Sequence, residues 1–437
     1  MELVPSRKIA ITGTFDVANY GDLLFPLIVK KRLKKAGYEL YPFSPIGGQP
    51  WEDSLMSQPI DSFIQNSNEY RALMIGGGNI IHANQTSLPD YKNQSTTAYA
   101  NLWLTAASAM RENQCILWNA PGVSEAINED LIEVVKTTLN NSTYITVRDE
   151  QSKSLLLNCS PKGDISVVPD TAWTIGDLWS EEELLDTYCK LFDSVGLNTP
   201  EKSITIHLNK RYLAGRTTAE TAEELSKIAE YESATMILVA TGPCHGDDTL
   251  ISEIASQLKV KAFIAPCNNL KKVTACFANS DAYIGSSYHG FIVSTVFNKP
   301  AVLIADSDKI KFKGLIELYP AIVSIQNTFS EAILELTRLR SQELVAIREA
   351  IIKENVSAVN EHFQKIQTKL NAHAPRKKFK YPENITHTIL KSQSLKNRVE
   401  ANNLRLEIKG LRKDQKRKLE DQKRKLEDQK RKLEDQK

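Results

Sequence analysis

Short apolar runs rich in β-branched residues alternate with segments of helical period along most of the chain. The first series of runs comprises residues 8–13 (KIAITG), 72–75, 115–119 (CILWN), 144–147 (YITV) and 165–168 (ISVV). Residues 23–35, after the first run, have the amphipathic spacing of a helix. This alternation is typical of parallel βαβ units, so we predict a Rossmann-like domain here.

A second series of apolar runs follows a break in the pattern. It comprises residues 203–208 (SITIHL), 235–240, 261–265, 281–285 and 301–305, with helical segments at 247–258, 270–279 and 291–298. Near-continuous apolar strands belong in sheets that are covered on both faces. The loop at 196–202 (GLNTPEK) separates the two series, because its Gly, Asn and Pro interrupt helical periodicity.

The predicted fold class is therefore α/β, with two Rossmann-like domains that face a cleft and a charged helical tail at the C-terminal end. We place the domains at residues 1–195 and 196–373, and a linker with the tail at 374–437. The second domain includes long helices from about residue 330 that are expected to pack back across both domains. Any active site is expected in the cleft between the domains.

The tail repeats the heptad DQKRKLE from Asp414, which spaces Leu419, Leu426 and Leu433 seven residues apart. A firm coiled-coil seam has two apolar positions in each heptad, and this repeat has one. A weak coiled coil that mediates self-association and a solvated single helix both stay open.

Amino-acid composition and charge exclude some classes of protein. Hydrophobic residues make up 41% and charged residues 25%, as in ordinary globular proteins. The net charge is +2, but residues 411–437 hold 12 basic and 7 acidic residues, which leaves the body mildly acidic. The body therefore lacks the excess of basic residues that is typical of nucleic-acid-binding proteins, and we expect no nucleic-acid partner. No run of the length of a membrane span or signal peptide occurs, so we expect a soluble cytoplasmic protein.

The six scattered cysteines form no CxxC pair, which predicts neither a disulfide framework nor a zinc site.

In the first domain, two loops after predicted strands carry candidate ligand-binding groups. Asn19 and Asp22 in TFDVANYGD are suited to hydrogen-bond sugar hydroxyls, although Asp22 could equally serve only as a helix cap. Gly76, Gly77 and Gly78 precede Asn79, and such a glycine run brings the backbone close to a ligand or to a neighbouring helix. The run has neither the GxGxxG spacing nor the P-loop lysine of a nucleotide site.

Arg148 follows another predicted strand of this domain, where a guanidinium can bind phosphate or carboxylate through two hydrogen bonds. An ion pair with Asp149 or Asp170 is the structural alternative.

In the second domain, GPCHGDD offers His245 as a general base oriented by Asp247 or Asp248; a turn with an aspartate helix cap is the alternative. The spacing of these residues matches no strong metal signature, so no metal is predicted.

The segment GSSYHG at 285–290 carries the most chemistry. Ser286, Ser287 and the amides through Gly290 lie where a helix is expected to begin, which is a site for anions. His289 falls in the same turn and is suited to donate to a phosphate or to shuttle a proton near neutral pH.

Taken in order, NYGD, GGG, VRDEQS, VVPD, SSYHG and FNKPAVLI resemble the motifs of the polysaccharide pyruvyl transferase family, over about residues 8–310. The resemblance implies a fold similar to GT-B glycosyltransferases and transfer of a pyruvyl group from phosphoenolpyruvate to a sugar of a cell-surface polysaccharide or its precursor. It implies His289 as the proton donor and Arg148 as an anion-binding residue. It requires no cofactor and no metal.

One position departs from the family. Many members have an arginine two residues before the histidine, where this chain has Ser287. Either another cation supplies the charge, with Arg148, Lys309, Lys311 and Lys313 as candidates, or the donor differs.

Two other functions stay open. One is a GT-B glycosyltransferase that uses a nucleotide sugar, and the other is a non-catalytic sugar-binding or assembly protein that works through its heptads. The basic tail also suggests contact with the inner face of a membrane near a lipid-linked acceptor.

Overall fold

The computed structural model describes residues 6–84, 88–91, 98–160, 163–213, 215–305, 312–372 and 379–394. The chain forms two compact units, residues 1–385 and 386–437. In the second unit the described residues, 386–394, are helical. The heptads predicted from the sequence lie outside the described residues. No helix within the described ranges is long and apolar enough to cross a membrane.

The first half of the larger unit is built on a parallel sheet with the strand order β3-β2-β1-β4-β5. Its strands are β1 (Lys8–Thr12), β2 (Glu39–Ser44), β3 (Gln58–Pro59), β4 (Ala72–Ile75) and β5 (Cys115–Trp118). A parallel bridge between Leu117 and Tyr144 continues the sheet toward the parallel pair β6 (Ile145–Val147) and β7 (Ile165–Val167). This order, with the chain reversing beside β1, is the doubly wound arrangement that places ligands at the carboxyl ends of the strands.

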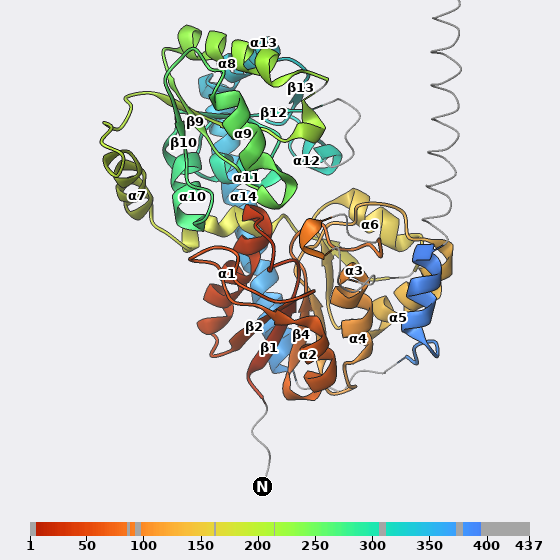
Figure 1. Cartoon of the computed structure of the whole chain (residues 1–437). Helices are drawn as coiled ribbons and strands as arrows, with labels where there is room; N and C mark the ends of the chain where they lie inside the picture. Colours follow the sequence, from red (N-terminus) through yellow and green to blue (C-terminus); the bar gives the residue numbers. More distant parts are fainter. Residues whose placement is uncertain are drawn as a thin grey trace, which may run out of the picture. The chain divides into compact units, whose positions relative to one another are not determined.

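Helices cover this sheet (Figure 1). They are α1 (Tyr20–Lys34), α2 (Ile60–Asn66), α3 (Ala98–Ala100), a π-helix (Asn101–Thr105), α4 (Ala106–Ser108), α5 (Ile132–Asn141), α6 (Glu150–Leu157) and the 3₁₀ segments Ser67–Glu69, Pro89–Tyr91, Glu129–Leu131 and η5 (Thr171–Asp177). The N-cap of α1 is Asn19, so Asp22 lies inside the first turn and is not the cap. The alternative that Asp22 caps the helix is therefore wrong.

The second half repeats the same winding, with the parallel order β10-β9-β8-β11-β12-β13. The strands are β8 (Ser203–His207), β9 (Thr235–Leu238), β10 (Ala262–Ile264), β11 (Ala282–Gly285), β12 (Ala301–Ile304) and β13 (Ile325–Gln326). The helices are η6 (Lys210–Tyr212), α8 (Thr218–Glu232), η7 (Pro243–His245), α9 (Asp247–Ala255), α10 (Leu270–Asn279), α11 (Tyr288–Val296), α12 (Lys313–Leu318) and α13 (Phe329–Leu339). Two parallel sheets in tandem confirm the predicted fold class.

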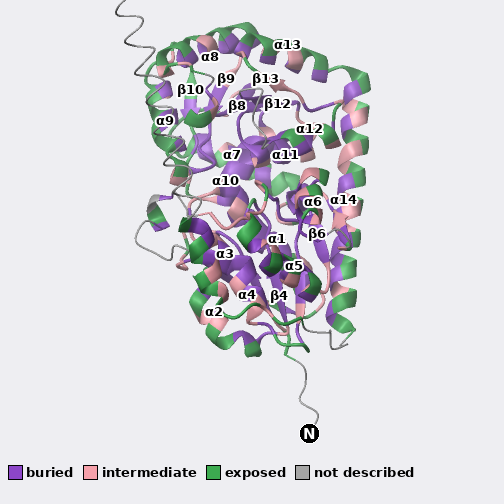
Figure 2. Ribbon diagram, turned by 90° about the vertical axis from the view of Figure 1, so that its right-hand side faces the viewer, coloured by how far each residue is buried: buried purple, intermediate pink, exposed green. Residues whose placement is uncertain are grey.

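Two helices connect the halves. The long helix α14 (Gln342–Asn371) runs beside both of them (Figure 2). Near its start, Arg348 Nε donates to Asn298 Oδ1 at 2.7 Å in the second half, and near its end the Leu370 carbonyl accepts from Arg71 Nε at 2.8 Å in the first. This confirms the expectation that the last helices pack back across both domains.

Helix α7 (Glu181–Asp193) precedes the predicted boundary at 195/196. It nevertheless packs against the second half: its Phe192 ring lies 4.6 Å from that of Phe263, and the Tyr188 hydroxyl shares a hydrogen bond of 2.8 Å with Ser203 Oγ. The boundary itself stays a prediction.

Candidate functional site

A cavity of about 380 Å³ lies where the carboxyl ends of the two sheets meet. Both halves line it. The first half contributes Thr14, Asn19, Asp22, Gly78, Asn79, Ile80, Tyr99, Val123, Ser124, Arg148, Asp149 and Gln151. The second half contributes His207, Asn209, Arg211, Tyr212, Thr241, Gly242, His245, Asp247, Ser286, Ser287, Tyr288 and His289. The predicted cleft is present, and it collects nine of the twelve residues that the sequence singled out.

The glycine run after β4 leads into the wall of this cavity, and steric constraints require glycine there. Gly76, Gly77 and Gly78 all have positive φ, at 92°, 70° and 77°, which side chains rarely adopt. A Cβ on Gly77 would lie 2.1 Å from Phe25 Cγ, so the run packs against α1. Gly78 lines the cavity, whereas Gly76 and Gly77 do not, and Gly77 shows the alternative of packing against a neighbouring helix.

Arg148 follows β6 and is 5% exposed. Its guanidinium lies 4.6 Å from the centre of the Tyr288 ring, its Nε is 3.4 Å from Asp149 Oδ2, and its Nη2 donates to Asn79 Oδ1 at 3.4 Å. Burial alone would lower the pKa of Arg148, but Tyr288, Asp149 and Asp170 raise it above its ordinary value. Arg148 therefore forms a structural ion pair with Asp149 and also contributes a positive charge to the wall of the cavity.

His289 lies in the first turn of α11 and faces Asp170, the N-cap of η5. Its Nε2 is 3.6 Å from Asp170 Oδ2, with side chains 14% and 1% exposed. Burial raises the pKa of Asp170, yet His289, Arg148 and the Ala172 N–H together hold that pKa below its ordinary value. Asp170 is therefore a buried carboxylate that stays ionised beside the histidine.

The first half also shapes the pocket around His289. A Cβ on Gly21 would lie only 1.9 Å from His289 Nδ1, and the Phe25 ring meets the imidazole edge-on at 5.3 Å. Gly21 therefore permits a close approach, and the approaching group is the imidazole of the other half.

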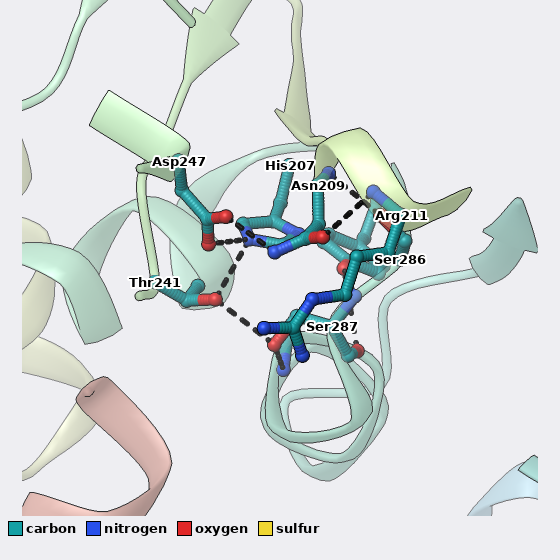
Figure 3. A network of polar contacts seen from close by, with 9 residues as sticks. His207, Asn209, Arg211, Thr241, Asp247, Ser286 and Ser287 are labelled. Carbon is teal, nitrogen blue, oxygen red and sulfur yellow. Dashed lines mark hydrogen bonds and ion pairs between the residues drawn. The ribbon is translucent and has the colours of Figure 1, made fainter. Parts of the chain in front are cut away.

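A second histidine–aspartate pair, His207 and Asp247, lies in the same cavity (Figure 3). His207 Nε2 is 2.9 Å from Asp247 Oδ2 and 2.8 Å from Thr241 Oγ1. Asn209 Nδ2 donates to Asp247 Oδ1 at 2.6 Å, and the Thr241 hydroxyl donates to Ser287 Oγ at 3.2 Å. The sequence reasoning missed His207, although a histidine at the end of a buried strand was the signal that could have found it.

This network corrects the interpretation of GPCHGDD. Asp247 orients His207 and not its sequence neighbour His245, because α9 turns the Asp247 side chain toward β8. Gly246 is the N-cap of α9, so the alternative of an aspartate cap is also wrong. His245 itself lines the cavity. Among the described residues, no group of three or more His, Cys, Asp or Glu side chains is arranged to hold a metal ion.

The anion site predicted from the amides of 286–290 needs a correction as well. The Ser286 N–H donates to the His207 carbonyl at 3.0 Å, and the Ser287 N–H donates to the Tyr283 hydroxyl at 3.0 Å. Ser287 is the N-cap of α11, and its Oγ accepts from the Gly290 N–H at 3.2 Å. These three amides already have protein partners, so they are not open donors, and Gly290 does not line the cavity. The cap also explains why α11 begins three residues before the predicted start.

Of the candidate cations, Arg148 lines the cavity and Lys313 does not; Lys313 Nζ lies 3.9 Å from Glu317 on its own helix. Lys309 and Lys311 lie outside the described residues. The cavity has a second arginine, Arg211, which the sequence reasoning did not consider.

Known structures with a similar fold include sugar-nucleotide enzymes. A UDP-GlcNAc 2-epimerase from Neisseria meningitidis bound to UDP-GlcNAc is 15% identical, with a TM-score of 0.52 over 83% of this chain and 99% of that one. A Listeria monocytogenes protein provisionally assigned as a UDP-N-acetylglucosamine 2-epimerase is 11% identical, with a TM-score of 0.51 over 86% of this chain and 100% of that one. At such identities the likeness shows the fold alone, which is that of GT-B enzymes.

No curated protein matches the sequence. The family model named polysaccharide pyruvyl transferase matches residues 19–308 of the 437. That range includes every cavity-lining residue that the sequence predicted, from Asn19 to His289. The chain belongs to the polysaccharide pyruvyl transferase family.

Proposed function

We propose that this protein transfers a pyruvyl group from phosphoenolpyruvate to two hydroxyls of one sugar, in a cell-surface polysaccharide or its precursor. The observation that carries the proposal is the His289–Asp170 pair, a histidine backed by an ionised buried carboxylate in the cavity of a member of this family. An enol phosphate reacts with an alcohol only when an acid protonates its methylene carbon, and this pair supplies such an acid.

The reaction balances in two steps. First, one sugar hydroxyl adds to C2 of the enol phosphate, His289 delivers a proton to C3, and the proton of the hydroxyl leaves to a base. This forms a tetrahedral carbon that carries methyl, carboxylate, phosphate and the sugar oxygen. Second, the neighbouring hydroxyl takes the place of the phosphate on C2, and it loses its proton as phosphate departs. The products are a cyclic pyruvate ketal and inorganic phosphate.

The residues divide between the two halves of the cavity. On the second half, His289 is the acid, and Asp170 reaches it from η5 to stabilise the imidazolium. Arg148, which comes from the first half, would meet the negative charge that grows on the departing phosphate. Asn19, Asp22 and the Gly78–Asn79 turn of the first half would hold the sugar hydroxyls. The scheme uses no metal and no organic cofactor, because phosphoenolpyruvate brings its own leaving group.

The decisive experiment incubates the full chain with phosphoenolpyruvate and a panel of sugars with free vicinal or 4,6-hydroxyls. We expect acceptor-dependent phosphate release, together with an acceptor whose mass rises by one pyruvate less one water. The proposal fails if no acceptor supports phosphate release and titration calorimetry detects no phosphoenolpyruvate binding.

A nucleotide sugar is the second candidate donor, because the Neisseria structure of similar fold binds UDP-GlcNAc. Saturation-transfer NMR with UDP-sugars, GDP-sugars and phosphoenolpyruvate in parallel samples separates the two. If only a nucleotide sugar gives a binding signal, then the donor is that nucleotide sugar and the transferred group is a glycosyl group instead of a pyruvyl group.

For the tail, we propose contact with an anionic membrane surface, which would bring the enzyme to a lipid-linked acceptor. Cosedimentation with anionic liposomes should fall when residues 374–437 are removed. Analytical ultracentrifugation of the same two chains tests self-association, and a loss of oligomer without a loss of liposome binding would assign the heptads to that role instead.

A further inference from the structure

Two arginines line the cavity, and their surroundings differ. Arg148 is packed into the wall: a Cβ on Gly122 would lie 2.6 Å from its Cζ, and it faces Tyr288, Asp149 and Asn79. Its charge is already partly balanced by carboxylates. Phosphoenolpyruvate carries both a phosphate and a carboxylate, so one buried and partly neutralised arginine leaves a charge deficit in the donor site.

Arg211 is the complementary case. It is exposed at the start of η6, it lines the same cavity, and within the described part of the chain its guanidinium makes neither an ion pair nor a hydrogen bond. An arginine without a carboxylate partner keeps its full charge and its five N–H donors for a ligand. In Figure 3 its side chain extends from η6 across the polar network toward Ser287.

Hydrogen bonds tie the backbone of Arg211 to the loop that carries Ser287. The Arg211 N–H donates to Asn209 Oδ1 at 3.0 Å, and the Asn209 N–H donates to Ser286 Oγ at 3.0 Å. Asn209 Nδ2 is in turn held by Asp247 at 2.6 Å. The backbone of Arg211 is therefore fixed beside the start of α11, while its guanidinium has no hydrogen-bond partner among the described residues.

Ser287 cannot supply the missing charge itself, because its hydroxyl is neutral and both of the hydrogen bonds at its Oγ are accepted from protein donors. Its Oγ caps α11 by accepting from the Gly290 N–H and also accepts from the Thr241 hydroxyl. We propose that Arg211 is the donor-binding cation of this enzyme, and that it meets the anionic end of the donor from η6, in place of an arginine at position 287. This inference rests on the proposed function for the identity of the donor.

The test is titration calorimetry of the full chain with phosphoenolpyruvate, for wild type, Arg211→Ala, Arg211→Lys and the control Lys210→Ala. Lys210 is the exposed neighbour of Arg211 on η6 and does not line the cavity. We expect Arg211→Ala to raise the Kd by about 10- to 100-fold, the range of a charge-assisted hydrogen-bonded contact. Arg211→Lys should recover part of the loss, and Lys210→Ala should bind as the wild type does.

Steady-state kinetics distinguish ligand contact from a structural role. Contact predicts a higher KM for phosphoenolpyruvate, an unchanged KM for the sugar and an unchanged thermal unfolding midpoint. If wild type binds phosphoenolpyruvate and Arg211→Ala binds it equally well, the inference is wrong and the proposed function stands.

If wild type neither binds phosphoenolpyruvate nor releases phosphate from it, the proposed function is wrong. The same variants are then titrated with UDP. Weaker UDP binding by Arg211→Ala than by Lys210→Ala would keep Arg211 as the donor-site cation, whereas equal binding would remove it from that role.

Discussion

The cavity contains two histidine–aspartate pairs that differ in almost every physical respect. His207 and Asp247 both belong to the second half, lie 2.9 Å apart, and have side chains only 3% and 2% exposed. His289 and Asp170 come from opposite halves, lie 3.6 Å apart, and leave the imidazole 14% exposed. The first pair is held by two further hydrogen bonds: His207 Nε2 shares one with Thr241 Oγ1, and Asn209 Nδ2 donates one to Asp247 Oδ1. His289 Nε2, in contrast, has no hydrogen bond within the described residues.

The difference separates structure from chemistry. A histidine whose Nε2 is shared between a carboxylate and a hydroxyl cannot release or accept a proton there without breaking buried bonds. A histidine that only faces a carboxylate is free to turn its proton toward a ligand. We therefore propose that His207–Asp247 holds the loops together and that His289–Asp170 transfers the proton.

The largest expected effect comes from His289→Gln. Removing the acid should lower kcat by about 10³-fold, within the range of general acid catalysis, while the unfolding midpoint stays near that of wild type. Phosphate release in the presence of the acceptor measures the rate, and thermal unfolding provides the control. A variant that is fully folded and fully active would show that His289 is not the acid.

Asp247→Ala tests the structural pair. It leaves His207 and Asn209 without their shared acceptor in a buried site, and we expect the free energy of unfolding to fall by about 3 kcal/mol. Denaturant titration measures this loss. Asp248→Ala is the matched control, since Asp248 is exposed one position further along α9 and should change stability by well under 1 kcal/mol. Equal stability of the two variants would contradict the structural assignment.

Gly21→Ala tests whether the first half positions the catalytic histidine. The added Cβ would lie 1.9 Å from His289 Nδ1, so the imidazole must leave its present position opposite Asp170. We expect a fall in kcat of about 10²-fold, because small displacements of a reacting group are costly. Alanine suits a helix better than glycine does, so α1 should not unfold.

Gly176→Ala is the control for this substitution, because a Cβ there meets nothing within 4 Å. It should keep wild-type kcat. If Gly21→Ala also keeps it, the close approach of the two halves has no part in catalysis.

Asp170→Asn keeps the shape of the active pair and removes its charge. The amide oxygen still caps η5 by accepting the Ala172 N–H, whose distance to Asp170 Oδ1 is 2.9 Å. Without the carboxylate, the imidazolium of His289 loses its partner, and we expect kcat to fall by about tenfold, as is usual for a group that acts through another. Unchanged kcat, measured at several pH values, would make Asp170 purely structural.

The sequence predicted most strands of both sheets but missed β2, β3 and β13. The runs that became β1, β4, β5, β8 and β11 are buried along almost their whole length, because both faces of the sheets are covered. Strand β2 (ELYPFS) contains Glu39 and Pro42 and shows no such run, and β3 and β13 have two residues each. Short or mixed strands are paired by their neighbours in space, which the local sequence pattern does not reveal.

The residues of the site could likewise be predicted only where the local sequence carries the signal. Loops at strand ends could be found one by one, and Asn19, Arg148 and His289, which were found in this way, all line the cavity. Partnerships could not be found in this way: Asp247 joins a histidine 40 residues away, and Asp170 joins one from the other half. Chain proximity suggested His245 and Arg148 as their partners, but side-chain direction on α9 and η5 decides the pairing.

A third histidine, the buried His362 on α14, sharpens the comparison because no carboxylate among the described residues pairs with it. It faces Tyr144 Oη at 3.4 Å and Asn119 Oδ1 at 3.3 Å, and burial, aided by the charge of Lys365, lowers the pKa of His362 to about 3. The unfolded chain takes up a proton near pH 6.5 that the folded chain refuses, so stability present above that pH is lost as the pH falls toward 3.

Between pH 7 and pH 5.5 this single group should lower the free energy of unfolding by about 1 kcal/mol. Denaturant titrations of wild type and His362→Gln at both pH values measure it as the difference between the two pH dependences. The glutamine variant should lose less stability on acidification than wild type, whatever its own stability at pH 7. Equal losses of stability in the two proteins would mean that His362 is protonated in the folded chain. Burial alone would then not keep this histidine neutral.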